Sequence, residues 1–421
     1  MGEHDMTDNN TTVAGIDCAL EKHQYQLASA TGAVLAKGSI ANSLAGGELL
    51  CKQLERHAAK DNVIIGIEAT NTYHLCLQHF LAGKGYKVIV INPMKTSAYT
   101  KIDDYGNKTD AIDANGICSF LLDGKHRTIK QMNQKYLKLR ELCRCLTKLQ
   151  ADLVRTALRL HSRLLVINPE FTQYFSETFS DSGLYILEKY PTPLQLAEAK
   201  EDELQQALDK IANGFGKPDT AQRIIGLAIE SFGVTADTEG YLRYIQHHLD
   251  AYRFLREKVR EIKKEIRAEA RKEYCCKEIE TISSIRGVGT EIAAGILAEL
   301  GDIRNFSKVS SIVRFAGMIV LRHSSGKTEG TSRMSKQGSR YLRCYLHQAA
   351  MGAKLHSVTF AAIYAQRNMK IKDLDPQSKK IARAKVRGCL ARRMLETIAL
   401  CLMKGRKFND KIAFDAIELD D

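Results

Sequence analysis

The sequence predicts an α/β amino-terminal domain, then a helical coiled-coil region, then a mostly α-helical carboxyl-terminal domain. Three observations predict this order. Short apolar runs alternate with helical patterns in the first 128 residues, two long helices with apolar stripes follow, and helical segments with Gly-containing loops fill the remainder. With 421 residues, the chain is long enough for two or three domains.

We expect domain boundaries where these patterns change. The predicted segments are a flexible tail at 1–12, an α/β domain at 13–128, a helical region at 129–276 with an insert at about 168–233, a carboxyl-terminal domain at 277–408, and an acidic tail at 409–421.

The first domain begins with strands and then alternates helices with strands. The expected strands are Val13–Asp17, Gln24–Ala30, Ala33–Ile40, Val63–Glu68 and Lys87–Asn92, and the expected helices are Glu48–Ala58, Tyr73–Ala82 and one beginning near Thr109. A strand hairpin followed by such alternation predicts a mixed sheet with helices on its faces.

Two long helices are expected in the central region, at about 136–164 and 241–272. In the first, leucines from Leu139 to Leu164 recur at alternating spacings of three and four, as in a coiled-coil seam. The two helices could pair within one chain as an antiparallel hairpin or between chains as a dimer, and both arrangements fit the pattern.

Composition predicts a polyanionic partner and a reducing compartment. The formal net charge is +13, and residues 301–421 alone hold 24 Lys and Arg against 10 Asp and Glu. The 11 cysteines form no CxxC pair and no zinc-like spacing with histidine, so free thiols are expected. Residues 1–12 are polar, unlike a signal peptide, and no long apolar run indicates a membrane span. We expect a cytoplasmic protein.

Four carboxylates are the leading candidate site. Asp17 and Glu68 each end a buried strand, whereas Asp110 and Asp113 share one face of a predicted helix. Acids at such positions could also serve as turn or capping residues or offset a helix dipole. Taken together, the four favour a site for hard divalent cations, which prefer oxygen ligands, and therefore phosphodiester chemistry.

Two loops could contact phosphates. Gly287-Val288-Gly289 joins two short helices and would expose backbone amides at a helix start, although it could also be a plain turn. Ser324-Ser325-Gly326 has cations on both sides and could supply a serine nucleophile, although a Ser-Gly pair is most often a turn. The cations near it are Arg322, His323, Lys327, Arg333, Lys336, Arg340 and Arg343. Residues 379–393 form a basic helix that is either a solvated face or a nucleic-acid contact.

These motifs together resemble a known family, the insertion-sequence transposases of the "IS one-ten" class, which includes the pilin-gene inverting recombinase. The matching amino-terminal motifs are Gly15-Ile16-Asp17, Ile67–Tyr73, Val90–Pro93 and Asn107–Ala114. The carboxyl-terminal ones are Ile285–Gly289, Phe315-Ala316-Gly317, Ser325-Gly326 and Ser332–Arg343. Arg286 stands where a proline is common, and Ser324 leaves a one-residue ambiguity in the position of the serine.

The resemblance implies a site-specific DNA recombinase with a RuvC/RNase H-like first domain. In that reading Asp17, Glu68, Asp110 and Asp113 hold Mg²⁺ or Mn²⁺, with two ions expected, and Ser325 forms a covalent phosphoserine link to DNA. It further implies nucleic-acid contacts by Lys108, Gly287, Gly289, Arg322, Lys327, Arg333, Lys336, Arg340 and Arg343. The implied partners are DNA, a structured non-coding guide RNA and further copies of the chain, as a dimer or tetramer, in a bacterial or archaeal cell.

Three function classes therefore stand. The first is the recombinase with a serine and a metal site. The second is a RuvC-like junction nuclease that uses metal-activated water without a covalent intermediate. The third is a catalytically silent nucleic-acid-binding protein, which the presence of all four acids disfavours.

Overall fold

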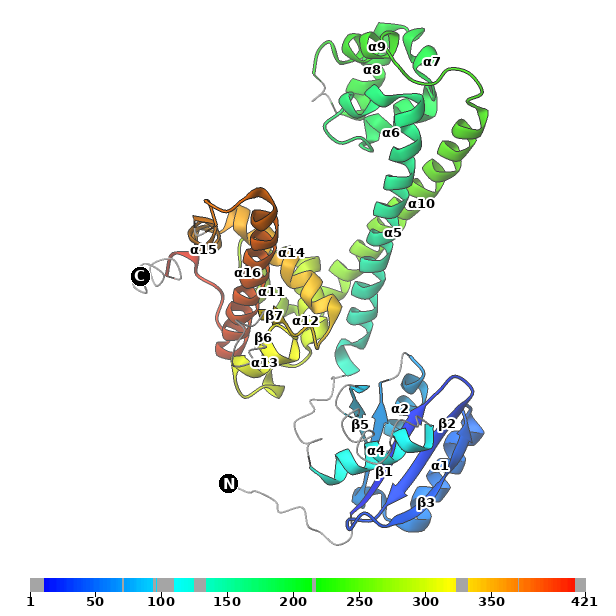
Figure 1. The fold of residues 1–421 in the computed structure, drawn as a ribbon, viewed down its shortest axis with the longest axis vertical. Coiled ribbons are helices and arrows are strands. Elements are labelled where there is room, and N and C mark those ends of the chain that lie inside the picture. Colours follow the sequence, from blue (N-terminus) through cyan, green and yellow to red (C-terminus); the bar gives the residue numbers. More distant parts are fainter. Residues whose placement is uncertain are drawn as a thin grey trace. The chain divides into compact units, whose positions relative to one another are not determined.

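The computed structural model describes residues 11–69, 72–93, 96, 110–124, 134–213, 217–322, 332–369 and 371–412. It divides into two compact units, residues 1–132 and 133–421, and each is treated separately below (Figure 1). Among the helices of the described residues, none has an apolar stretch long enough to cross a bilayer.

The amino-terminal unit is built on one five-stranded sheet with the order β3-β2-β1-β4-β5. Its strands are β1 (Thr12–Cys18), β2 (Lys22–Ala28), β3 (Val34–Ala41), β4 (Val63–Glu68) and β5 (Lys87–Ile91). β2 is antiparallel to both β1 and β3, whereas β4 is parallel to β1 and to β5. The predicted mixed sheet is therefore confirmed.

Helices cover both faces of this sheet. α1 (Leu44–His57) and α2 (His74–Gly83) bury Leu50 and Leu77 against one face, together with Ile16 and Ile65 from the strands. α4 (Asp110–Leu122) packs on the opposite face. The central strands are apolar toward both helical layers, because their valines and isoleucines are buried on either face.

Two long helices dominate the start of the second unit. α5 (Leu137–Ile167) and α10 (Glu239–Ala270) contact each other along their length. Leu146 near the start of α5 shares a core with Val259 near the end of α10, while Leu160 shares a second core with Leu249. The helices are therefore antiparallel partners within one chain, the first of the two arrangements that the sequence allowed.

The segment between these helices folds into a helical lobe. It contains α6 (Asp181–Lys189), α7 (Pro193–Ala197), α8 (Glu201–Ile211) and α9 (Thr220–Ile229). Their buried side chains surround Phe171 and Tyr174, whose rings are 5.0 Å apart. Short 3-10 turns occur at Lys60–Asn62, Gln134–Tyr136, Pro169–Gln173 and Ile303–Asn305.

The carboxyl-terminal part is mostly helical, as the sequence predicts. It contains α11 (Cys276–Ser283), α12 (Thr290–Leu300), α13 (Val309–Phe315), α14 (Arg340–His356), α15 (Val358–Met369) and α16 (Pro376–Lys404). Two short strands, β6 (Val320–Arg322) and β7 (Ser332–Met334), form an antiparallel hairpin. The core around α12 and α14 also includes Leu139 of α5 and Ile266 of α10, so both long helices are anchored in it.

Candidate functional site

Asp17 and Glu68 occupy equivalent positions on two neighbouring parallel strands. The register pairs Gly15 with Gly66 and Ile16 with Ile67, so the two acids are the next residues along β1 and β4. Because side chains alternate between faces, both acids lie on the face that carries Val13 and Ile64, which is the face covered by α4. Both acids are partly exposed. Sheet pairing therefore brings these two predicted site residues together.

Glycines in the same two strands let α4 lie directly on the sheet. A Cβ atom on Gly15 would be 2.3 Å from the carbonyl oxygen of Ala114, a distance that no side chain tolerates. The amide of Gly15 donates to Cys118 Sγ at 3.1 Å. A Cβ on Gly66 would be 2.9 Å from Ile117. The two glycines therefore let α4 pack closely against β1 and β4, two residues before each acid.

The direction of α4 places its first turn at the acidic end of the strands. The end of β2 pairs with the start of β1, so the turn after β2, which contains Gly32, lies beside the start of β1. Leu122, the last residue of α4, has the side chain nearest to Gly32. α4 therefore begins near the carboxyl ends of β1 and β4. Asp113, next to Ala114, is on that first turn and is partly exposed; Asp110 begins the helix, but its side chain lies outside the described residues.

Thr96 is a member of this site that sequence reasoning missed. Its side chain is 1% exposed, and its hydroxyl donates to Glu68 Oε2 at 2.6 Å. Thr96 also bonds the carbonyl of Pro93, the last residue of the matched Val90–Pro93 motif. A hydroxyl three residues after that motif was the signal available in the sequence. This bond fixes one carboxylate oxygen of Glu68.

Over the described part of the chain, no three His, Cys, Asp or Glu residues are grouped closely enough to hold a metal ion. Lys108 and the side chain of Asp110 fall outside that part. The described acids therefore supply a partial set of oxygen ligands, at one edge of the sheet, of the chemistry that hard divalent cations prefer.

The second candidate site belongs to the other unit. Ser324, Ser325, Lys327 and His323 lie outside the described residues, as do the side chains of Arg322 and Arg333. The segment that contains Ser325 connects β6 to β7, and the backbones of Leu321 and Arg333 pair across that hairpin. The hairpin thus brings together the two chain positions that flank the serine.

Two sequence motifs near this hairpin, Phe315-Ala316-Gly317 and Ser332–Arg343, pack against each other at glycines. A Cβ on Gly338 would be 2.3 Å from the carbonyl oxygen of Phe315, and one on Gly317 would be 2.7 Å from the amide of Gln337. The amide of Lys336, a residue with φ of 56°, donates to the carbonyl of Gly317. Each loop therefore determines the conformation of the other.

The two predicted phosphate-binding arginines of α14 differ in their surroundings. Arg343 is half-buried and donates to the carbonyls of Ala316 and Gly338 at 3.2 and 2.8 Å, so it braces the interlocked loops. Burial lowers the pKa of this guanidinium. Arg340 is exposed, and its guanidinium lies 4.9 Å from the ring of Tyr341. Of the two, Arg340 is the more accessible to a nucleic acid.

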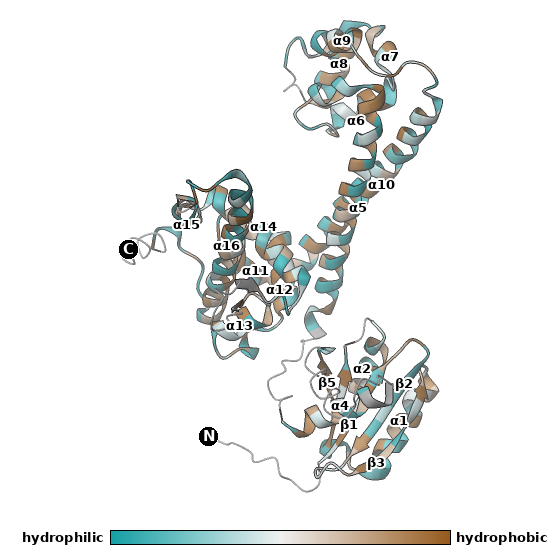
Figure 2. Cartoon of the chain, viewed as in Figure 1, coloured by the Kyte–Doolittle hydropathy of each residue, from teal (hydrophilic) through white to brown (hydrophobic). Residues whose placement is uncertain are grey.

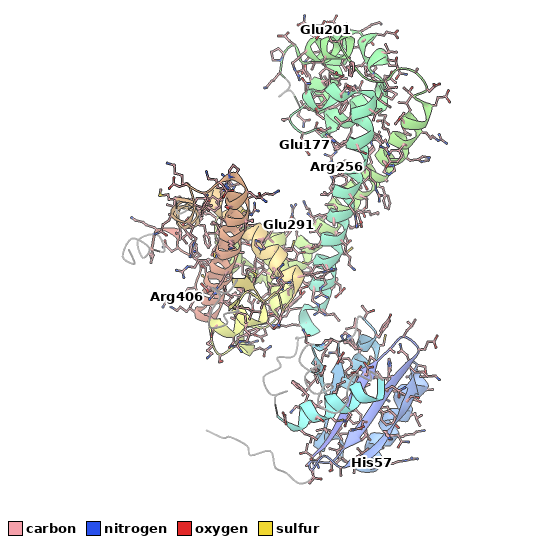
Figure 3. All side chains as sticks on the ribbon, in the orientation of Figure 1. His57, Glu177, Glu201, Arg256, Glu291 and Arg406 are labelled. Atoms are coloured by element: carbon pink, nitrogen blue, oxygen red, sulfur yellow. The ribbon has the colours of Figure 1, made fainter. Side chains whose placement is uncertain are left out.

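The predicted Gly-x-Gly turn joins α11 to α12. Gly287 has φ of +88°, and a Cβ there would be 2.3 Å from the carbonyl oxygen of Gly352 in α14. Gly289 precedes α12 and is exposed. In the first turn of α12, Glu291 (labelled in Figure 3) forms an ion pair with Arg267 of α10 at 2.6 Å. The structure thus gives Gly287 a packing role within the unit.

One buried acid joins three helices of this unit. Glu299 in α12 is 2% exposed and receives two hydrogen bonds from Arg144 of α5, at 2.6 and 3.0 Å. The hydroxyl of Ser339 donates a hydrogen bond to the same carboxylate at 2.6 Å. The same oxygen also accepts a hydrogen bond from the amide of Leu342 and so caps α14. Glu299 therefore positions the start of α14 relative to α5.

Replacing Glu299 by Ala is expected to destabilise the protein by about 3 kcal/mol, because the half-buried Arg144 would lose both hydrogen bonds to this buried carboxylate. Chemical denaturation measures this loss. Glu280→Gln is the matched control, since Glu280 is exposed and lies 3.7 Å from the exposed Lys407; its cost should be below about 1 kcal/mol. Equal effects of the two substitutions would contradict the assigned role.

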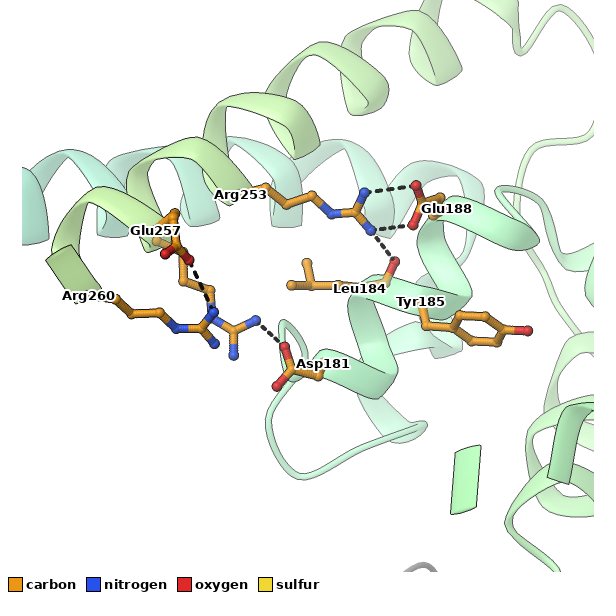
Figure 4. A pocket seen from close by; sticks show the side chains of 8 residues that line it. Asp181, Leu184, Tyr185, Glu188, Arg253, Glu257 and Arg260 are labelled. Atoms are coloured by element: carbon orange, nitrogen blue, oxygen red, sulfur yellow. Dashed lines mark hydrogen bonds and ion pairs between the residues drawn. The ribbon is translucent and has the colours of Figure 1, made fainter. Parts of the chain in front are cut away.

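A polar hollow of about 400 Å³ lies between α6 and α10 (Figure 4). Its charged groups neutralise one another: Arg253 contacts Glu188 at 2.9 Å, and Arg256 contacts Asp181 at 2.5 Å. The pairs hold the lobe against α10, and none of the sequence-predicted site residues lines the hollow. We assign it a structural role.

Two transposase family models match the chain. One, described as "Transposase", matches residues 14–169, and the other, "Transposase IS116/IS110/IS902 family", matches residues 279–365. The first therefore covers the acidic site, and the second covers the hairpin and the interlocked loops.

Individual proteins show the same similarity. The "Mini-circle putative transposase for IS117" of Streptomyces coelicolor is 25% identical over 375 residues, which cover 83% of this chain and 87% of that protein. The "Transposase for insertion sequence element IS1111A" of Coxiella burnetii is 31% identical over 100 residues, covering 24% of this chain and 27% of that protein. A solved structure of T. thermophilus RuvC in complex with a Holliday junction substrate matches 28% of this chain and 98% of its own, with 12% identity and a TM-score of 0.23.

Proposed function

Because the chain belongs to the IS116/IS110/IS902 family of transposases, we propose that it cuts and rejoins DNA at the ends of an insertion sequence by using two sets of residues. The acidic set is Asp17, Glu68, Asp110 and Asp113, and the nucleophile is Ser325. The observation that carries the first half of the proposal is the register that places Asp17 beside Glu68 on the face covered by α4.

The acidic set suits Mg²⁺ or Mn²⁺. Asp17 and Glu68 occupy neighbouring positions on adjacent strands, Asp113 lies on the first turn of α4, and Thr96 donates a hydrogen bond to Glu68. These are hard oxygen ligands in a partly exposed place, the chemistry that such cations require. When bound, two ions would activate a nucleophile and stabilise negative charge on a leaving oxygen. The protein's part is to hold these carboxylates near one another at this edge of the sheet.

The serine step exchanges one phosphate ester for another. The Oγ atom of Ser325 forms a bond to the phosphorus of the DNA backbone, and the bond from phosphorus to one deoxyribose oxygen breaks. The proton lost by the serine is matched by the proton that the released deoxyribose hydroxyl gains. Because the phosphoserine link conserves the ester bond, the reverse attack by a new deoxyribose hydroxyl rejoins DNA without a nucleotide cofactor.

The proposal extends to partners and location. The charge of the carboxyl-terminal part, 24 Lys and Arg against 10 Asp and Glu from residue 301 onward, supports contacts with DNA and with a structured guide RNA. The proposed contacts are Lys108, Gly289, Arg322, Lys327, Arg333, Lys336 and Arg340. We also propose that the protein acts in the cytoplasm, at the nucleoid, as a dimer or tetramer.

Metal removal tests the proposal against a junction nuclease that uses water. With DNA containing the element ends, the wild-type chain should form covalent protein–DNA adducts in Mg²⁺, and EDTA should abolish them; adducts are detected as protein-linked DNA on denaturing gels. Restoration by added Mg²⁺ is the control for damage by the chelator. Metal-dependent cleavage that leaves no adduct would favour the junction nuclease instead.

A further inference from the structure

The first ten residues of α16 project from the domain core. From Pro376 to Lys385 every residue is exposed or partly exposed, and the first buried side chain is Val386. Asp375 caps this end by accepting from the amides of Gln377 and Ser378 at 3.0 Å, and Pro376 takes the first helical position. These turns are therefore regular helix, although the rest of the protein buries little of their surface. They are mostly hydrophilic in Figure 2.

The charges on this segment work against its own stability. From residue 376 to 395 α16 has seven Lys and Arg and no Asp or Glu. Lys380, Arg383 and Arg387 follow one another at spacings of three and four, where like charges repel, and cations near a helix start oppose its dipole. A polyanion bound along this face would reverse both penalties.

On the exposed surface of α10, in contrast, cations form ion pairs with acids of the same helix. There Lys258 pairs with Glu261 at 2.7 Å, and Arg260 pairs with Glu257 at 3.4 Å. Within the part of the chain that the structure describes, Lys380, Arg383 and Arg387 form no such ion pair. These three cations of α16 are thus left available to a partner.

The basic face leads to the hairpin that flanks Ser325. Next to Arg387, a Cβ on Gly388 would lie 3.4 Å from the Cε atom of Met334 in β7. Across the contact of α14 with α16, burial and the positive charges of Arg387 and Arg343 lower the pKa of His347, so these three side chains are neighbours. From Lys380 to Arg387 the helix advances about 10 Å, the span of two or three phosphates of one strand.

We propose that Lys380, Arg383 and Arg387 form a phosphate track that binds the backbone of the DNA being recombined and delivers it to the base of the β6–β7 hairpin. The proposal rests on the function proposed above. DNA is the expected occupant, and not RNA, because the track ends beside the hairpin whose connecting segment contains the proposed nucleophile toward DNA. Its contacts are to phosphates and therefore independent of base sequence.

Salt-dependent binding tests the track without requiring catalysis. The full chain, wild type and the double variant Arg383→Gln/Arg387→Gln, is titrated with a 30-base-pair DNA duplex of arbitrary sequence at several salt concentrations. Each lost phosphate contact should reduce the slope of log affinity against log salt by about 0.9. We expect a slope smaller by about 1.8 and a Kd raised about tenfold or more at 0.1 M salt.

Arg392→Gln/Arg393→Gln is the matched control, since it removes the same charge from the same helix at residues paired with Glu396. Its slope should stay close to that of the wild type, and circular dichroism should show unchanged helix content in both variants. Equal loss in both variants, no loss in the track variant, or a loss confined to an RNA duplex of equal length would each overturn the proposal. Because no adduct is measured, a failure of the serine mechanism would leave this result interpretable.

Discussion

Replacing Ser325 by Ala is expected to abolish covalent protein–DNA adducts while leaving DNA binding intact. The Oγ atom is the proposed attacking group, and alanine has no hydroxyl oxygen whose lone pair could attack phosphorus. The predicted phosphate contacts come from cations and amides elsewhere in the chain, so the affinity for DNA should change by less than about twofold. Denaturing gels measure the adduct, and fluorescence anisotropy with the same DNA measures binding.

Ser324→Ala is the natural control because it removes the same group from the preceding residue. It should keep at least about half of the wild-type adduct. Adducts that persist in Ser325→Ala and disappear in Ser324→Ala would move the nucleophile by one residue. Adducts that persist in both variants, and in the double variant, would refute the serine mechanism.

Asp17→Asn is expected to reduce DNA cleavage by about 10³-fold. The amide keeps the shape of the side chain but removes the negative charge that a divalent cation requires, and it leaves Glu68 of β4 without its acidic neighbour on β1. The loss should be similar for adduct formation and for strand exchange, since both depend on the same charge. Rates of cleavage at saturating Mg²⁺ give the factor.

Asp61→Asn supplies the comparison, because Asp61 is an exposed acid of the same unit that precedes β4. Its activity should equal that of the wild type within about twofold, and both variants should melt like the wild type. If Asp17→Asn retained full cleavage, the acidic set would have no catalytic role, and the strand-end carboxylates would serve structure alone.

The sequence predicted the sheet because its signals are local. The run expected at Val13–Asp17 is β1, Thr12–Cys18, and the run expected at Ala33–Ile40 is β3, Val34–Ala41. Apolar runs ending in acids also indicated which strand ends to compare. The apolar runs could not indicate the order of the strands in the sheet, because β1 pairs with a strand far along the chain. Thr12 of β1 pairs with Val63 of β4, 51 residues later.

The remaining features depend on contacts that no local pattern contains. Glu299 lies in an apolar helix, and its partner Arg144 is 155 residues earlier in the chain. Gly317 and Gly338 belong to separate sequence motifs, although a side chain on either glycine would collide with the backbone of the loop that contains the other. Thr96 gave no periodic signal at all. Such residues are explained by close approach in three dimensions, which a single sequence does not reveal.

The antiparallel pairing of α5 with α10 has a consequence for how this protein can vary. The chain leaves the carboxyl-terminal core at one end of α5 and returns to it at the matching end of α10, so residues 168–238 are a topological insertion. Removing equal lengths of α5 and α10 would shorten the helical pair and keep its contacts with the carboxyl-terminal core. The lobe is thus an interchangeable module, whose size can change without disturbing the connectivity of the domain that contains the proposed nucleophile.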